Sequence, residues 1–200
     1  MENIELQKHD FAIIPKPPFE LQRGCFIGGG FIRDCFLGKQ HADIDMFFEG
    51  EGQRKRFKSY NNHLFSNLVH ESPNAETYKF DQHTIQLIKK DFISFGDYFE
   101  QVDFTICQFV MEGGHFYSTT SAIVDALKGQ LVVKSIQEGF ELDSLRRAFK
   151  YQQKGFKPTF ACMVELALKI QAVNDDGIDN KLLRGVSLSP LTEGDEMTWS

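Results

Sequence analysis

The sequence lacks the patterns that mark secreted, membrane-spanning and zinc-stabilised proteins. It shows no secretory signal, and none of its apolar runs approaches the about 18 residues that a membrane-spanning helix needs. It has four cysteines but no Cys-x-x-Cys pair and no histidine at a spacing typical of zinc. The cysteines are Cys25, Cys35, Cys107 and Cys162. Because each lies in an apolar context, we expect buried, reduced thiols in a protein of the cytoplasm.

The chain is also poor in positive charge. Lys and Arg number 22 against 28 Asp and Glu, so the formal net charge is −6. This balance excludes non-specific nucleic-acid binding by the whole surface, so any RNA contact needs a local basic patch. Phenylalanine, by contrast, is abundant, with 20 residues in a chain of 200. We interpret these residues as a Phe-rich core in one domain, or in one domain with a helical appendage.

The most informative segment is 28–45, in which three glycines open a short predicted helix and two aspartates follow it. The glycines are Gly28, Gly29 and Gly30. Such a turn lets phosphate oxygens approach the backbone closely and directs the N–H groups of a helix start outward. Asp43 and Asp45 alternate with apolar residues on a predicted strand, so they share a face with Cα atoms about 6.5 Å apart. Two such carboxylates can hold Mg²⁺ and leave coordination positions for water and phosphate oxygens. The segment predicts a triphosphate cradle beside a divalent metal site.

This segment resembles the nucleotidyltransferase head of the family of CCA-adding enzymes and bacterial poly(A) polymerases. The family motif is Gly-Gly-x-Val-Arg-Asp, then Gly, then Asp-x-Asp. The matching residues here are Gly29, Gly30, Phe31, Ile32, Arg33, Asp34, Gly38, Asp43 and Asp45. The resemblance covers residues 20 to 157, and it implies the nucleotidyltransferase fold of the DNA polymerase β superfamily. It also implies a structural or phosphate-side role in nucleotide binding for Arg33 and Asp34.

Hydrophobic patterning predicts an α+β fold: a mixed β-sheet flanked by helices, followed by a small helical neck. Strands are expected at 25–27, 44–48, 78–80, 83–89, 104–111 and 116–117, and helices at 31–37, 94–101, 159–173 and in a stretch ending near residue 69. From Glu141 onward only helical spacing remains. We therefore expect a head domain at 1–140, a neck at 141–175 and a loosely ordered tail at 176–200. The further helical body and tail domains of the family have no recognisable counterpart, which suggests a compact version.

Asp103 is a candidate catalytic residue with two alternative roles. A second family motif, Arg-Arg-Asp-Phe-Thr-Ile-Asn, is similar to residues 103–107, although Gln101 and Val102 replace its arginines. Superfamily members usually place a third carboxylate on a neighbouring strand, and here Gln86 occupies that position. Asp103 then either supplies the third carboxylate or contacts the ribose of the nucleotide.

The neck begins with a basic helical stretch. It is similar to the family's Glu-Asp-x-x-Arg motif, which implies that Asp143 and Arg146 read the base of the nucleotide, although Leu142 replaces the glutamate. Arg146, Lys150 and Lys154 recur at i, i+4 and i+8, so they share one face of the helix. That face, with Arg147, either contacts nucleotide phosphates or RNA, or is simply solvated.

Together these features predict a nucleotidyltransferase that moves a nucleotide from a nucleoside triphosphate to a hydroxyl and releases pyrophosphate. Asp43 and Asp45 would hold the cofactor, two Mg²⁺ ions or Mn²⁺. By resemblance, the acceptor is the 3′ end of an RNA such as a tRNA, and no membrane partner is expected. Transfer to a protein or small-molecule hydroxyl is one alternative. A non-catalytic nucleotide- or RNA-binding module is another, because Gln86 and the missing arginines depart from the family pattern.

Overall fold

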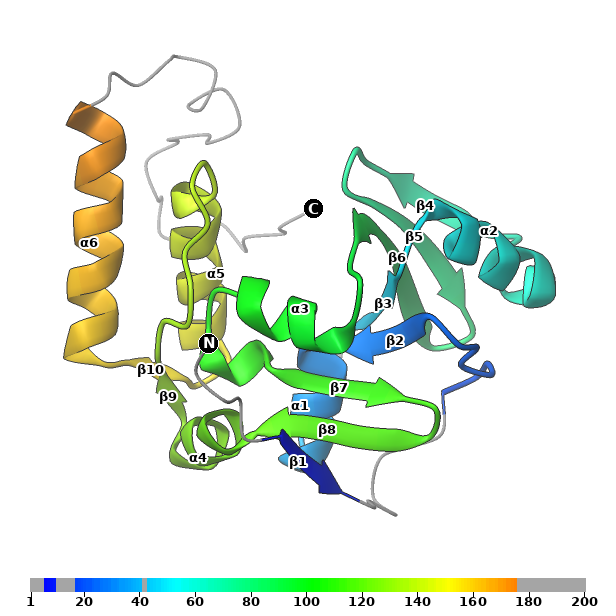
Figure 1. The fold of residues 1–200 in the computed structure, drawn as a ribbon, viewed down its shortest axis with the longest axis horizontal. Coiled ribbons are helices and arrows are strands. Elements are labelled where there is room, and N and C mark those ends of the chain that lie inside the picture. The colour runs from blue at the N-terminus through cyan, green and yellow to red at the C-terminus, as the bar shows by residue number, and fades with distance from the viewer. Residues whose placement is uncertain (1–5, 10–16, 41–42, 176–200) are drawn as a thin grey trace, which may run out of the picture.

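The computed structural model describes residues 6–9, 17–40 and 43–175, and it confirms the α+β class (Figure 1). Within these residues the main sheet has eight strands in the order β1-β8-β7-β2-β3-β6-β5-β4. The strands are β1 (Leu6–His9), β2 (Cys25–Gly28), β3 (Asp43–Phe48), β4 (Leu68–Glu71), β5 (Ala75–Phe80), β6 (His83–Asp91), β7 (Phe109–Glu112) and β8 (His115–Thr119). Only β3 and β6 pair in parallel, so the sheet is mixed.

Six α-helices surround this sheet in the described residues. They are α1 (Gly30–Phe36), α2 (Glu51–Tyr60), α3 (Phe95–Gln101), α4 (Thr120–Lys128), α5 (Glu141–Gln153) and α6 (Phe160–Asp175). Two 3₁₀ turns lie between a helix and the following strand: η1 (Asn62–Leu64) between α2 and β4, and η2 (Thr105–Cys107) between α3 and β7. A separate pair of short strands, β9 (Gln130–Leu131) and β10 (Lys157–Pro158), is parallel. In Figure 1, α5 and α6 stand side by side at one end of the molecule, and α2 with the β4–β5–β6 meander forms the other end.

The helix expected to end near residue 69 is shorter than its apolar spacing predicts. Phe57 and Leu64 are buried as the spacing requires, but α2 ends at Tyr60 and residues 68–71 form β4. At this end the Asn61 side chain donates a hydrogen bond to the Phe57 carbonyl oxygen. That bond satisfies a terminal carbonyl and favours termination of the helix.

Two further departures from the expected elements lie on either side of the β7–β8 hairpin. The strand expected at 104–111 begins only at Phe109, because residues 105–107 form η2. Helix α4 was not expected at all. Its start is capped by the Thr119 hydroxyl, which accepts a hydrogen bond from the Ala122 N–H, and it ends at Gly129 in the left-handed conformation.

The hydrophobic core crosses the expected boundary between head and neck. Phe104 and Ile106 from the head share one buried cluster with Ala148, Phe156 and Cys162 from the neck. Residues on both sides of position 140 therefore depend on the same buried contacts. The tail expected at 176–200 lies outside the described residues.

The buried residues confirm two expectations from composition. All four cysteines are free and buried, and burial raises the pKa of Cys25 to about 12. Phenylalanines dominate the core, as in the stacked pair Phe26 and Phe47, whose ring centroids lie 5.3 Å apart. None of the helices in the described ranges combines the length and apolarity that crossing a bilayer requires.

Candidate functional site

The glycine turn lies between β2 and α1 and is shaped by the aromatic residues beneath it. Gly29 has a φ of 72°, which favours glycine, and its N–H donates to the Phe109 carbonyl oxygen at 2.7 Å. A Cβ atom on Gly28 would lie 2.8 Å from the Phe47 ring and 3.0 Å from the Tyr98 ring. The turn therefore has no room for a side chain at Gly28, and α1 begins directly after it.

Asp43 and Asp45 lie on β3, on the face that borders the glycine turn. Asp45 is the direct neighbour of Gly28 on β2 and of Gln86 on β6. The register confirms that Gln86 stands beside the aspartate pair, where a third carboxylate was considered. Burial and the nearby Asp43 carboxylate raise the pKa of Asp45 to about 6, although Lys150 and the lysine at 154 act in the opposite direction.

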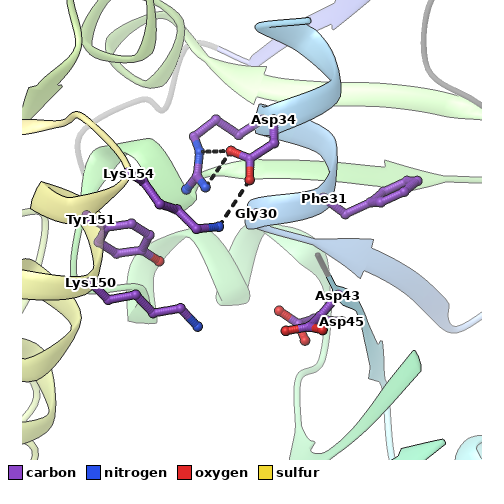
Figure 2. Close-up of a pocket in the computed structure, with 9 residues that line it drawn as sticks. Gly30, Phe31, Asp34, Asp43, Asp45, Lys150, Tyr151 and Lys154 are labelled. Carbon is purple, nitrogen blue, oxygen red and sulfur yellow. Dashed lines mark hydrogen bonds and ion pairs between the residues drawn. The ribbon is translucent and has the colours of Figure 1, made fainter. Parts of the chain in front are cut away.

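A cleft separates the aspartate pair from helix α5 (Figure 2). It is lined by Gly30, Phe31, Arg33, Asp34, Asp43, Asp45, Lys150, Tyr151 and Lys154. In Figure 2 the Lys150 side chain extends from α5 toward Asp43 and Asp45, and the Lys154 ammonium reaches Asp34. The cleft thus places carboxylates on one wall and ammonium groups on the other.

Arg33 and Asp34 connect α1 to α5. The Arg33 side chain is 0% exposed, and its Nε and Nη2 donate to Asp34 Oδ1 at 2.8 and 2.6 Å. Its guanidinium carbon also lies 5.2 Å from the centroid of the Tyr151 ring and 5.0 Å from that of Phe156. Of the two roles predicted for this pair, such complete burial favours the structural one for Arg33.

Asp103 lies at the junction of head and neck and is not part of the cleft lining. Its carboxylate is 8% exposed and accepts a hydrogen bond from Arg147 Nε at 2.5 Å. Burial raises the pKa of Asp103 even though Arg147 opposes this shift. In the described ranges no group of three or more His, Cys, Asp or Glu side chains could hold a metal ion. The structure therefore does not group Asp103 with Asp43 and Asp45 as a third ligand.

Asp143 and Arg146 form an exposed ion pair near the start of α5, outside the cleft lining. The structure thus places Lys150 in the cleft with the aspartates. The other predicted residues of α5 lie nearer its start and do not line the cleft: Asp143, Arg146 and Arg147. Three of the four cations on α5 and its C-cap have a carboxylate partner: Arg146 with Asp143, Arg147 with Asp103, and Lys154 with Asp34.

Tyr151 is the cleft residue that sequence analysis missed. Its ring lies at the Arg33 guanidinium, and its hydroxyl is 3.0 Å from the Cys107 sulfur. Its position three residues after the buried Ala148 and three before Lys154 puts it on the side of α5 that faces the head. That spacing is the signal that could have identified it.

The donor set of the aspartate pair fits a hard divalent cation. Both groups offer carboxylate oxygens, the ligands that Mg²⁺ prefers, and Mn²⁺ accepts the same ligands. Burial and the Asp43 carboxylate both disfavour the charged form of Asp45 and raise its pKa, and a bound cation would favour that charged form. Asp43 and Asp45 are thus the residues that could hold a metal.

Comparison with known proteins gives one sequence family and one fold. The model of the Gabija anti-defense 2 (Gad2) protein family matches residues 5–128. None of the curated proteins matches the chain.

Among solved structures, the chain is similar to the Thermotoga maritima CCA-adding enzyme complexed with tRNA, at 20% identity and a TM-score of 0.59, covering 80% of this chain and 41% of that one. A CCA-adding enzyme in complex with ATP is 20% identical, with a TM-score of 0.61, and the match covers 80% of this chain and 42% of the enzyme. A tRNA-processing enzyme with CTP is 18% identical, with a TM-score of 0.54, and the match covers 80% of this chain and 46% of that enzyme. The chain thus spans less than half the length of each. These similarities confirm the predicted nucleotidyltransferase head fold.

Proposed function

The chain belongs to the Gabija anti-defense 2 family, and on that premise we propose that it is a metal-dependent nucleotidyltransferase whose transfer reaction serves that anti-defense role. The observation that carries the proposal is the cleft, where Asp43 and Asp45 face Lys150 across a gap bordered by Gly30. Carboxylates for a cation, an ammonium group for phosphate and a close-approach glycine turn are the parts that triphosphate chemistry requires.

In the proposed reaction an acceptor hydroxyl loses its proton to solvent water, and its oxygen forms a bond to the α-phosphorus of a nucleoside triphosphate. The bond between that phosphorus and the bridging oxygen breaks, and pyrophosphate leaves with the electron pair. Two Mg²⁺ ions, or Mn²⁺, held by Asp43 and Asp45 would neutralise phosphate charge and acidify the hydroxyl. Lys150 balances charge on the phosphates, and the turn at Gly29 and Gly30 lets their oxygens approach the backbone.

The remaining predicted residues are proposed to act on the nucleoside. Asp143 carries the acceptor and Arg146 the donor groups that base reading needs, but in this structure the two side chains form an ion pair with each other. A bound base would therefore have to replace this ion pair with its own hydrogen bonds to the two side chains. Asp103, bound to Arg147 and absent from the cleft lining, fits the ribose-side role better than the metal-ligand role.

The acceptor proposed first is an RNA 3′ end, supported by the likeness to a CCA-adding enzyme complexed with tRNA. A protein or small-molecule hydroxyl is the second candidate. It is favoured by the charge pattern, because most cations of the basic helix α5 are paired with carboxylates and the net charge is −6. We also keep as proposals the division into a head at 1–140 and a neck at 141–175, and a cytoplasmic location.

The test is to incubate the protein with each of the four α-labelled ribonucleoside triphosphates, with Mg²⁺ or Mn²⁺, and with total cellular RNA or a protein extract. Label that ribonuclease removes supports the RNA acceptor, and label that protease removes supports a protein acceptor. The matched control is the Asp43→Asn/Asp45→Asn variant, which should give no label. Triphosphate binding without any transfer would instead support the non-catalytic binding module, for which Gln86 beside Asp45 is the structural argument.

A further inference from the structure

Lys154 contacts the buried Arg33–Asp34 pair and also lines the cleft beside Asp43 and Asp45. Its ammonium lies 3.2 Å from Asp34 Oδ2, on the far side of that carboxylate from Arg33. Asp34 is 3% exposed, whereas Lys154 is 34% exposed and lines the cleft (Figure 2). The lysine therefore has one buried partner and one side open to the cleft.

Arg33 leaves the charge of Lys154 largely available. Asp34 Oδ1 already accepts two hydrogen bonds from the Arg33 guanidinium, so the arginine neutralises this carboxylate. Lys154 is then a second cation on one anion. A lysine ammonium has three N–H donors, and the bond to Asp34 uses one of them. The other two remain for an acceptor in the cleft.

The charge of the cleft supports an anionic ligand only when a metal is bound. Its lining holds three cationic and three carboxylate side chains, which balance. Two divalent ions would give the site a charge of about +4, which matches the about four negative charges of a triphosphate. Lys154 lines the same cleft as Asp43 and Asp45, so its ammonium group belongs to this site.

We propose that Lys154 is a further nucleotide-binding residue, contacting the triphosphate, and that Asp34 is the positioning residue that orients it. Arg33 holds Asp34, Asp34 holds the ammonium of Lys154 by one donor, and the two free donors bind phosphate oxygens. Pre-organisation of this kind lowers the entropy cost of binding. It also gives the buried Arg33–Asp34 pair a function beyond packing. This inference rests on the proposed function, because it requires that the cleft takes a triphosphate.

The test measures binding of ATP, CTP, GTP and UTP, each with Mg²⁺, by isothermal titration calorimetry. Lys154→Ala should weaken binding of the preferred triphosphate about tenfold to a hundredfold, as expected for loss of a charge-assisted hydrogen bond. Lys154→Arg should retain binding to within about fivefold of the wild type, because the charge remains. The matched control is Lys157→Ala, an exposed lysine outside the cleft lining, which should bind like the wild type.

A double-mutant cycle separates positioning from a merely structural role for Asp34. Asp34→Asn alone should weaken binding about three- to tenfold, and it should add nothing in the Lys154→Ala background, because Asp34 acts through Lys154. Additive effects would show that Asp34 acts by another route. Should Asp34→Asn unfold the protein, the Lys154→Ala and Lys154→Arg pair still decides the phosphate contact, since Lys154 is partly exposed.

The outcomes also distinguish this inference from the proposed function. If Lys154→Ala binds a triphosphate as tightly as the wild type does, the inference alone is overturned. Binding that depends on Lys154 but leads to no transfer supports the inference and refutes the transferase activity. Wild-type protein that binds none of the four triphosphates overturns both.

Discussion

At the scale of single residues, the aspartate pair combines a proposed chemical role with a cost in stability. The pKa of Asp45 rises from its ordinary 3.8 to about 6 because of burial and the charge of Asp43. The folded state therefore holds the proton more tightly than the unfolded state does. This contribution to the free energy of unfolding is present below pH about 4 and is lost as the pH rises to about 6.

We predict that Asp43→Asn/Asp45→Asn folds normally and, without metal, is more stable than the wild type at neutral pH, by on the order of 2 kcal/mol. The difference should grow between pH 4 and pH 6, measured by thermal unfolding in EDTA at a series of pH values. Adding Mg²⁺ should raise the Tm of the wild type but not that of the variant. Equal Mg²⁺ responses would refute the assignment of these residues as metal ligands.

Asp103 allows a second test at this scale. If it contacts the ribose side of the nucleotide, Asp103→Asn should change the ratio of rates with ribo- and deoxyribonucleotides. If it is a third carboxylate, both rates should fall together, because metal-assisted chemistry does not depend on the 2′-hydroxyl. Its burial and its ion pair with Arg147 lead us to expect the first result. Comparing kcat/KM for the two nucleotide classes decides between them, and an unchanged ratio at an unchanged rate leaves Asp103 purely structural.

At the scale of elements, α5 presents different chemistry at its two ends. Lys154 at its C-cap and Lys150 line the cleft beside the aspartates, whereas Asp143 and Arg146 pair near its start. Because residues three apart share a helix face, Asp143 and Arg146 can contact the same base.

We predict that Asp143→Ala or Arg146→Ala changes which triphosphate is used. Loss of one hydrogen-bonding partner from a desolvated base costs about 1–3 kcal/mol, enough to reduce discrimination roughly tenfold or more. The measurement is incorporation of each of the four triphosphates by each variant, with Lys157→Ala as the control. An unchanged preference in both variants would mean that α5 does not read the base.

At the scale of the whole molecule, head and neck share buried contacts and should unfold together. Phe156 is 1% exposed, belongs to the cluster that contains Phe104 and Ile106, and lies against the Arg33 guanidinium. Phe156→Ala should lower the free energy of unfolding by about 3–5 kcal/mol. In urea the wild type should show one transition by far-ultraviolet and near-ultraviolet circular dichroism. Two separate transitions would show that the neck is an independent unit.

Much of the fold and part of the site could be predicted from the sequence because they depend on neighbouring residues. Strand alternation put Asp43 and Asp45 on one face, and the register later placed Gln86 beside them. Where the local signal was ambiguous, prediction was wrong: residues 68–71 extend the apolar spacing of α2 but form an edge strand. Helix α4 was missed, although its Thr cap and terminal glycine are local features.

The sequence by itself thus determined the glycine turn, the carboxylate pair and the basic composition of α5. Only the tertiary structure decided which of those basic residues face the carboxylates. A helix face can be derived from spacing, but its rotation and depth against the head depend on contacts between residues more than 40 positions apart, such as Arg147 with Asp103 and Lys154 with Asp34. Those long-range contacts place Lys154 at the buried Arg33–Asp34 pair and pair Asp103 with Arg147. Local sequence does not specify such contacts.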